Sequence, residues 1–290
     1  MVRQKIAVTG ANGQLGMELR DASVLYPQYE FIFLSRSQLA IENTASVNSF
    51  FTKNHPQYCI NCAAYTAVDA AESAREEAFR INTEAVGVLA AACKEYNCRL
   101  MHISTDYVFD GEAFVPYKED SPTNPQSVYG ASKLAGEILA MQNNPETIII
   151  RTSWVYSSYG KNFVKTMLRL MQEKDVINVV NDQYGSPTYA ADLAEVLMKI
   201  IASQTWQPGI YHFSNDGAIS WYDFAGCIKK VTASSCKINP VPTSAYPAKA
   251  KRPAYSVLDK TRIMQTFGIE LKNRKQSLAG CIQKINKGGD

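Results

Sequence analysis

The chain has 290 residues, a formal net charge of +3 and 46% hydrophobic residues. It is long enough to bury a large core in one α/β domain or in two unequal ones. The weak charge balance gives no reason to expect nucleic acid or an anionic membrane as a partner. Because no apolar stretch reaches the length of a membrane span, the sequence also predicts no transmembrane helix.

The cysteines favour a reducing compartment. Seven is an odd number, and most of them lie in apolar runs, which fits free thiols in the cytoplasm better than a disulfide framework. Cys59 and Cys62 have C-x-x-C spacing, but residues three apart in a strand face opposite sides, and no second pair completes a zinc site. We therefore expect both in the core. We also expect no signal peptide, because the first residues already lead into a strand.

The first predicted strand, residues 5–9, runs directly into a glycine-rich turn. Gly10, Gly13 and Gly16 are spaced three apart, and a helical segment follows. Glycine lets the backbone turn tightly and approach a pyrophosphate, which the positive helix N-terminus attracts. Strand, turn and helix in this order are typical of a dinucleotide site, the alternative being an ordinary βα turn. We assign cofactor binding here to Gly10, Asn12, Gly13, Gln14, Leu15 and Gly16.

The second predicted strand, residues 31–34, ends in Ser35 and Arg36. In sites for NAD an acid commonly follows this strand and bonds the ribose hydroxyls, but no acid occurs here before Glu42. A guanidinium and a hydroxyl suit the 2′-phosphate of NADPH, whereas the alternative is an exposed loop arginine. We predict NADPH as the cofactor, with Ser35 and Arg36 among its ligands, and NADH as a second cofactor that the chain could accept.

Strands and helices alternate over the first 150 residues. A strand at residues 58–64 is followed by a segment from Thr66 to Asp69 that leads into one long predicted helix ending at about Tyr96. The next strand ends at Thr105. Such alternation predicts an α/β fold, a Rossmann-like doubly wound parallel sheet, whose ligands bind beyond the carboxyl ends of the strands.

The pattern changes after Tyr156. The expected elements are then a helix at residues 163–172, a strand at 176–180 and a helix at 191–202. We predict an NAD(P)-binding domain over residues 1–155, which residues from about 181 to 205 rejoin. Residues 156–290 should form mainly a smaller C-terminal α/β substrate lobe.

Tyr129 and Lys133 have the i, i+4 spacing that puts two side chains on one helix face. A free phenol has a pKa of about 10, and a neighbouring ammonium lowers it, so that the phenol can exchange a proton with a carbonyl oxygen. Thr105 could hydrogen-bond the same oxygen. The pair alone is a weak signal, because tyrosines and lysines are common in this chain and a solvated surface pair is the alternative. Together with the glycine turn, it predicts a catalytic group of Thr105, Tyr129 and Lys133.

With these residues placed, the chain resembles the extended short-chain dehydrogenase/reductases, and among them the dTDP-4-dehydrorhamnose reductases. The resemblance runs from Gly10 to about Leu258 and is carried by blocks in a fixed order: residues 13–16, 64–72, 104–109, 151–156, 181–188 and 241–247. It implies a reduction in nucleotide-sugar biosynthesis. NADPH would reduce the 4-keto group of dTDP-4-dehydro-L-rhamnose, which gives dTDP-L-rhamnose.

The resemblance also implies roles for single residues. Tyr129 would protonate the sugar oxygen, Lys133 would hold the nicotinamide ribose, and Thr105 would steady the carbonyl. The cofactor site would add Ala63, Ala64 and Tyr65 to the glycine turn, together with Tyr129 and Lys133. The substrate site would comprise Thr66, Val68, Asp69, Thr105, Asp106, Tyr107, Trp154, Asn162 and Arg252. The alternatives are a core position for Trp154 and a surface position for Arg252, and we expect Trp221 in the core.

The chain also departs from the family pattern. Some members pair through a metal that clustered glutamates hold at a dimer interface. Glu18 matches one of these, but Ala191 stands at another position, and residues 283–287 lack the third. We therefore predict no metal, and a monomer or a homodimer without a metal bridge.

A dehydratase of this fold would carry an acid pair directly after the threonine, but Tyr107 occupies the second place here, so elimination lacks its base. Three other functions remain open. The chain could be another short-chain reductase of nucleotide sugars, or an epimerase, which uses the same threonine, tyrosine and lysine but recycles a bound NAD. It could also be a regulatory subunit that binds a dinucleotide without catalysis, although the intact catalytic group argues against this role. Stoichiometric oxidation of NADPH with the dTDP-keto-sugar would distinguish the reductase from the epimerase and from the regulatory subunit.

Overall fold

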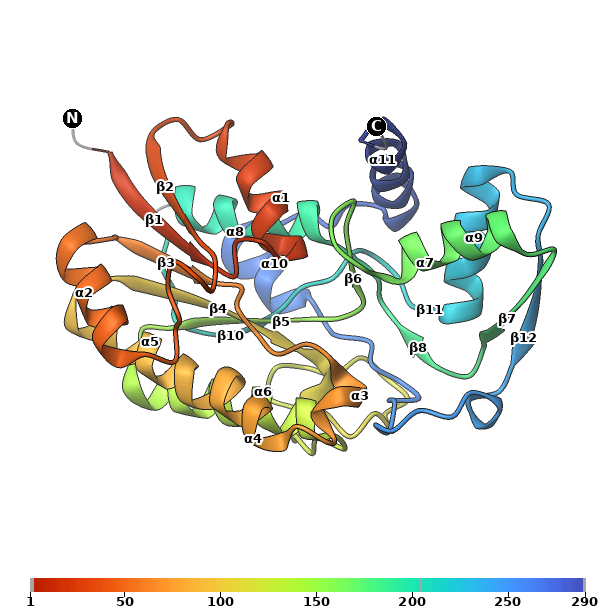
Figure 1. The fold of residues 1–290 in the computed structure, drawn as a ribbon, viewed down its shortest axis with the longest axis horizontal. Coiled ribbons are helices and arrows are strands. Elements are labelled where there is room, and N and C mark those ends of the chain that lie inside the picture. Colours follow the sequence, from red (N-terminus) through yellow and green to blue (C-terminus); the bar gives the residue numbers. More distant parts are fainter. Residues whose placement is uncertain (1–2, 204, 289–290) are drawn as a thin grey trace.

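The computed structural model describes residues 3–203 and 205–288. Its centre is a six-stranded sheet with the strand order β10-β5-β4-β3-β1-β2, and all five pairings are parallel (Figure 1). The strands are β1 (Gln4–Thr9), β2 (Tyr29–Leu34), β3 (Tyr58–Asn61), β4 (Arg99–Thr105), β5 (Ile148–Thr152) and β10 (Gly209–His212). The predicted parallel sheet is confirmed.

Helices cover both faces of this sheet (Figure 1). On one face α1 (Gln14–Ser23), α8 (Ala190–Ala202) and α10 (Thr261–Phe267) pack against the strands. On the other face lie α2 (Thr44–Asn54), α5 (Ala85–Glu95) and α6 (Val128–Asn143). Because the central strands are buried on both sides, they are almost continuously apolar, as in Ile148, Ile149 and Ile150 of β5.

The single long helix predicted for residues 66–96 is wrong. The structure has α3 (Val68–Ala71), α4 (Arg75–Phe79), one turn of π-helix (Arg80–Glu84) and then α5. Two contacts with α6 explain the breaks. Glu72 Oε1 accepts the N–H of Val128 at 2.8 Å, and Asn82 Nδ2 donates to Ser132 Oγ at 3.0 Å. The widened turn brings the Asn82 carbonyl against the bare Cα of Gly136, so tertiary packing overrides helix propensity here.

The second half of the chain adds a smaller α/β part with its own core (Figure 1). It contains α7 (Phe163–Glu173), β7 (Val176–Val180), α9 (Trp221–Thr232), β12 (Lys237–Val241) and α11 (Arg274–Lys287), and β7 pairs with β12 in parallel. Short strands and one turn link it to the sheet: β6 (Val155–Tyr156), β8 (Tyr184–Gly185), β9 (Thr188–Tyr189), β11 (Ile219–Ser220) and the 3₁₀ turn Thr243–Ala245.

An ion pair between a buried carboxylate and a half-buried lysine connects the C-terminal helix to the sheet part. The Glu18 carboxylate in α1 is 2% exposed, accepts from Ser157 Oγ at 2.6 Å and pairs with Lys284 Nζ of α11 at 2.6 Å. Lys284 Nζ also pairs with Asp21 at 2.5 Å. Side chains of the chain itself thus compensate the buried charge. In the described part of the chain, no three histidine, cysteine or acidic side chains are grouped so that they could bind a metal ion.

All seven cysteines are free thiols. The expected core position is right for Cys59, which is buried in β3. It is right only in part for Cys62, which is half-buried and packs against the core but also lines a cavity, because β3 ends at Asn61. Over the described ranges, no helix has the length and apolar character that crossing a membrane requires.

Candidate active site

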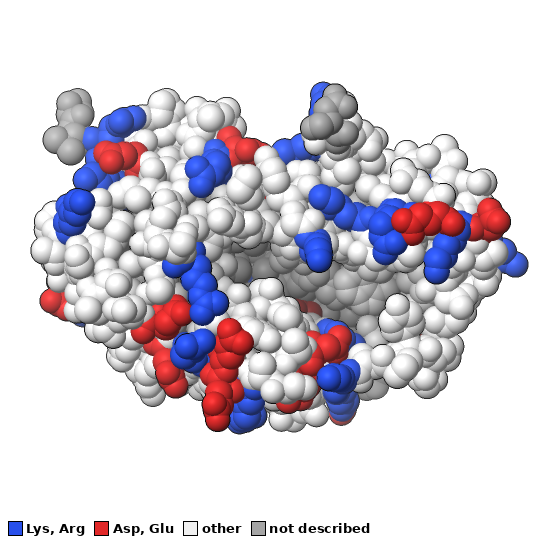
Figure 2. Space-filling model, viewed as in Figure 1, with Lys and Arg blue, Asp and Glu red and all other residues white. Residues whose placement is uncertain are grey.

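A cavity of about 810 Å³ lies at the carboxyl ends of the sheet strands, where a doubly wound fold binds its ligands. Figure 2 shows the molecule hollowed between its two parts at this place. Most of the predicted site residues line this one cavity: Gly10, Asn12, Gly13, Gln14, Leu15, Gly16, Ser35, Arg36, Ala63, Ala64, Thr66, Val68, Thr105, Asp106, Tyr107, Tyr129, Lys133 and Trp154.

The glycine turn at the cavity is sterically restricted to glycine. Gly10 has a φ of +65°, and a Cβ there would lie 2.6 Å from the backbone nitrogen of Ala63. A Cβ on Gly16 would lie 2.6 Å from the Gly10 carbonyl oxygen. Helix α1 then begins after Gly13, which offers no side-chain cap. The first N–H groups of the helix are therefore available to a phosphate group.

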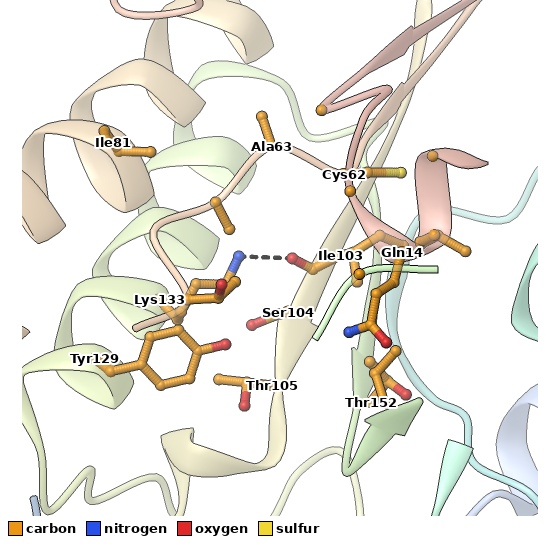
Figure 3. Close-up of a pocket in the computed structure, with 18 of the residues that line it drawn as sticks. Gln14, Cys62, Ala63, Ile81, Ile103, Ser104, Thr105, Tyr129, Lys133 and Thr152 are labelled. Atoms are coloured by element: carbon orange, nitrogen blue, oxygen red, sulfur yellow. Dashed lines mark hydrogen bonds between the residues drawn. The ribbon is translucent and has the colours of Figure 1, made fainter. Parts of the chain in front are cut away.

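The predicted catalytic pair lies on the buried face of α6. Ser127 caps this helix by accepting the N–H of Gly130 at 3.1 Å, and Tyr129 and Lys133 follow one turn apart. Figure 3 shows the Tyr129 hydroxyl pointing toward Thr105, whereas the Lys133 ammonium points to the carbonyl of Ile103. Lys133 is 1% exposed, and its Nζ donates to that carbonyl at 2.6 Å.

The structure corrects the expectation that Lys133 lowers the pKa of Tyr129. Burial is the largest influence and raises the pKa of the phenol above its ordinary value; Thr105 lowers it, and the Asp106 carboxylate raises it further. Desolvation prevails because the ammonium is directed to a backbone carbonyl. A phenol that keeps its proton at neutral pH is suited to donate that proton to an oxygen atom.

Burial lowers the pKa of Lys133 to about 8, although Glu137 and the Cys62 thiol both raise it. The amine therefore changes its charge just above neutral pH.

Asp106 lines the cavity, but its carboxylate is almost fully buried. Its Oδ1 accepts from Thr105 Oγ1 at 3.0 Å, while its buried Oδ2 has no partner among the described residues. Burial raises the pKa of Asp106 to about 6, with Ser256 and Thr105 acting in the opposite direction.

Comparison with known proteins identifies the family of proteins that has this fold and this cavity. Residues 4–287 match the family model described as the RmlD substrate binding domain. A dTDP-4-dehydrorhamnose reductase from Aggregatibacter actinomycetemcomitans is 44% identical over 284 residues, which cover 94% of this chain and 97% of the relative. The chain belongs to the dTDP-4-dehydrorhamnose reductase family.

Solved structures of this family agree. The chain superimposes on a dTDP-4-dehydrorhamnose reductase from Clostridium acetobutylicum with a TM-score of 0.94 at 42% identity, covering 98% of this chain and all of that one. The reductase from Bacillus anthracis, solved in complex with NADP, gives a TM-score of 0.94 at 38% identity, with the same coverage. These findings confirm the predicted resemblance and the enzyme class, an oxidoreductase.

Four residues predicted for the site of this reductase do not line the cavity: Tyr65, Asp69, Asn162 and Arg252. The Tyr65 backbone is held by Asn82, whose side chain bonds both its N–H and its carbonyl. Asn162 caps α7 and donates to Gln14 Oε1 at 2.9 Å, so its amide is used within the protein. Both residues support the cavity wall from behind.

The Arg252 guanidinium is partly engaged within the protein and keeps further N–H donors for a ligand. It pairs with Asp69 at 2.5 Å and donates to the Tyr107 hydroxyl at 3.0 Å. Both partners had been predicted as substrate ligands, and Tyr107 lines the cavity. In the structure Arg252 therefore links the Asp69 carboxylate to the Tyr107 hydroxyl at the cavity.

Trp154 lines the cavity in a strained backbone conformation, with a φ of +48°. Its indole stacks on Trp221 with ring centroids 3.4 Å apart and an interplanar angle of 6°. A Cβ on Gly185 would lie 2.5 Å from this indole, so only glycine fits there. Trp221, expected in the core, is half-buried and serves as the platform for Trp154.

Sequence analysis assigned no role to several residues that line the cavity: Leu39, Ile41, Glu42, Cys62, Ile81, Ile103, Ser104, Thr152, Ser153, Val155, Gly160, Lys161 and Leu193. Thr152 ends strand β5, so the rule about strand ends could have found it. Lys161 and Leu193 come from distant segments and have no local signal. Glu42 pairs with Arg36 at 3.1 Å, a contact that spacing does not predict.

Proposed function

We propose that this chain reduces the 4-keto group of dTDP-4-dehydro-L-rhamnose with NADPH, forming dTDP-L-rhamnose. The observation that carries the proposal is the position of Tyr129, which lies beside Thr105 in the cavity that also contains the glycine turn and keeps its proton because its pKa is raised. Membership of the family supports the proposal, because relatives named for this reaction match nearly the entire chain.

A bound nicotinamide cofactor would supply the hydride that reaches the keto carbon. Tyr129 then gives its proton to the sugar oxygen, and Thr105 holds that oxygen by a hydrogen bond. Lys133 would hold the ribose hydroxyls of the bound cofactor with its ammonium. Because Lys133 is buried, such a contact would be stronger than one made in water.

The cofactor site would be shared between several segments. The backbone of residues 10–16 would hold the pyrophosphate, and Ala63, Ala64 and the Tyr65 backbone would border the nicotinamide half. Ser35 and Arg36 would bind the 2′-phosphate of NADPH. Glu42 lies beside Arg36 and could bond the ribose hydroxyl of NADH, so we propose that both cofactors are accepted and that NADPH is preferred.

We expect Arg36→Ala to weaken NADPH binding by about tenfold, the worth of one charge-assisted hydrogen bond, and NADH binding by less than about twofold. The guanidinium is 63% exposed, so its removal leaves the core intact. Dissociation constants from cofactor fluorescence test this. Glu42→Gln is the reciprocal variant and should weaken NADH more. Equal losses for both cofactors in Arg36→Ala would contradict the assignment.

The reaction rate should fall as the pH rises through about 8, because Lys133 loses its ammonium charge there. The sign follows from burial, which lowers the pKa of the amine from its ordinary value, so the charged form persists only below about 8. The pH dependence of kcat/KM measures this limb. In Lys133→Arg the guanidinium stays charged, so the residual rate should stay flat up to pH 10. A limb at the same pH in that variant would assign the titration to another group.

The substrate would fill the remainder of the cavity. Asp106, Tyr107 and Trp154 would surround the sugar, and Thr66 and Val68 would complete the wall. We assign residues 1–155 to the cofactor domain, which residues from about 181 to 205 rejoin, and residues 156–290 mainly to the substrate lobe. Seven free thiols support a cytoplasmic reaction. The active unit would be a monomer or a homodimer.

The decisive experiment is a spectrophotometric assay of the purified chain with NADPH and the dTDP-keto-sugar. One NADPH should be oxidised for each sugar reduced. An epimerase would convert the sugar without net oxidation, and a regulatory subunit would bind the cofactor without turnover.

A further inference from the structure

A buried chain of hydrogen bonds ends at Lys133, and the proposed reaction does not use it. Thr9 Oγ1 donates to Asn61 Oδ1 at 2.6 Å, and Asn61 Nδ2 lies 3.0 Å from His102 Nδ1. His102 Nε2 lies 3.3 Å from Lys133 Nζ. All four side chains are buried, and they come from β1, β3, β4 and α6.

The hydrogen bonds of Asn61 fix which nitrogen of His102 carries the proton. Asn61 Oδ1 accepts from the Thr9 hydroxyl and also from the N–H of Ala63 at 3.1 Å, so its amide cannot be turned around. Its Nδ2 must therefore donate to His102, whose Nδ1 accepts. Burial lowers the pKa of His102 well below its ordinary value, which keeps the ring neutral. The single proton then lies on Nε2.

This tautomer directs an N–H toward Lys133. An ammonium has three donors and no lone pair, so it cannot accept from His102 Nε2–H, whereas a neutral amine can. The other groups facing Lys133 act differently: the Ile103 carbonyl accepts from Nζ, and Glu137 and Cys62 raise the pKa of the amine. Among the described residues that contact Lys133, the imidazole of His102 is the one that favours the neutral amine.

We propose that His102, oriented by Asn61 and Thr9, is a positioning residue that makes the ammonium of Lys133 easier to deprotonate. Its effect is to bring the charge change of the amine into the range in which the enzyme works. The catalytic consequence rests on the proposed function, whereas the tautomer can be tested without it.

The first experiment reads the tautomer directly. The chain has three histidines, so the ¹⁵N chemical shifts of the imidazoles can be assigned with single substitutions. We expect His102 to show a protonated Nε2 and an unprotonated Nδ1 throughout the folded pH range. His55, which is exposed, provides the internal reference for a solvent-accessible imidazole in the same spectra. A proton on Nδ1 of His102 would overturn the proposal even in an active enzyme.

The second experiment measures the alkaline limb of kcat/KM. His102→Phe removes the N–H, and Asn61→Leu frees the ring to turn its acceptor toward Lys133. Each should move the limb upward by about one pH unit, and the double variant should move it no further than His102→Phe. His102→Gln can offer an oxygen to the ammonium, so it should shift the limb in the same direction. This polar variant serves as a second test in case His102→Phe fails to fold.

His212→Phe is the matched control, because His212 is the other buried histidine and bonds the Tyr117 carbonyl instead. It should leave the limb in place. A lower rate with an unmoved limb in all His102 and Asn61 variants would reduce His102 to a packing role and overturn the proposal. If the wild-type chain oxidised no NADPH, the proposed function would fail, while the ¹⁵N experiment would still decide on the tautomer.

Discussion

Replacing Tyr129 by phenylalanine should lower turnover by roughly 10²–10⁴-fold, the usual contribution of a general acid, and leave NADPH binding nearly unchanged. The phenol points toward Thr105 (Figure 3), and burial raises its pKa, so it keeps its proton. Phenylalanine retains the ring that packs edge-to-face on Tyr107, with ring centroids 5.6 Å apart, so the cavity should keep its shape. Steady-state rates and cofactor titration measure the two quantities separately.

Tyr107→Phe is the matched control, because it removes a neighbouring hydroxyl from the same cavity. That hydroxyl accepts from Arg252 and gives no proton in the proposed mechanism, so the variant should mainly raise the KM for the sugar. If Tyr129→Phe turned over at a near-normal rate, another group would have to supply the proton.

Replacing Arg151 by methionine should lower the free energy of unfolding by about 3–5 kcal/mol, because it leaves a buried carboxylate without its partner. Arg151 Nη2 of β5 pairs with Glu137 Oε2 of α6 at 2.7 Å, and both side chains are 2% exposed. Ser104 Oγ donates to the same carboxylate at 2.5 Å. Urea unfolding monitored by circular dichroism gives the change.

The exposed pair Arg169–Glu173 provides the control. Arg169→Met should cost less than about 0.5 kcal/mol, since solvent already screens that charge. The double variant Arg151→Met/Glu137→Leu should regain most of the stability lost in Arg151→Met, because it leaves no charge unpaired. A loss in Arg151→Met as small as in Arg169→Met would mean that water reaches Glu137.

The same ion pair matters for the site. Glu137 follows Lys133 by one helical turn, as Lys133 follows Tyr129, so the three side chains lie along one face of α6. The contacts of Glu137 with Arg151 and Ser104 fix the rotation of this helix against β4 and β5. The buried contacts of Glu137 with Arg151 and Ser104 therefore determine where Tyr129 and Lys133 lie.

The sequence by itself determined the features whose physical cause is local. A tight turn before a helix requires glycine, so Gly10, Gly13 and Gly16 marked the cofactor turn, and the structure shows why a side chain cannot fit at Gly10. Helical spacing was enough to put Tyr129 and Lys133 on one face. Alternation of apolar strands with helices predicted the parallel sheet, and the order of the sheet brings Thr105 to the edge where the turn lies.

Only the tertiary structure decided what depends on distant segments. The helix after Asp69 is broken because Glu72 and Asn82 find partners on α6, more than forty-five residues away in the chain. Arg252 likewise finds its partners, Asp69 and Tyr107, in segments that are far from it in the sequence. The pKa of Tyr129 could not be predicted from the spacing of residues in the sequence. The neighbouring lysine alone predicted a lowered pKa, but the pKa is raised, because desolvation depends on all the segments that cover the phenol.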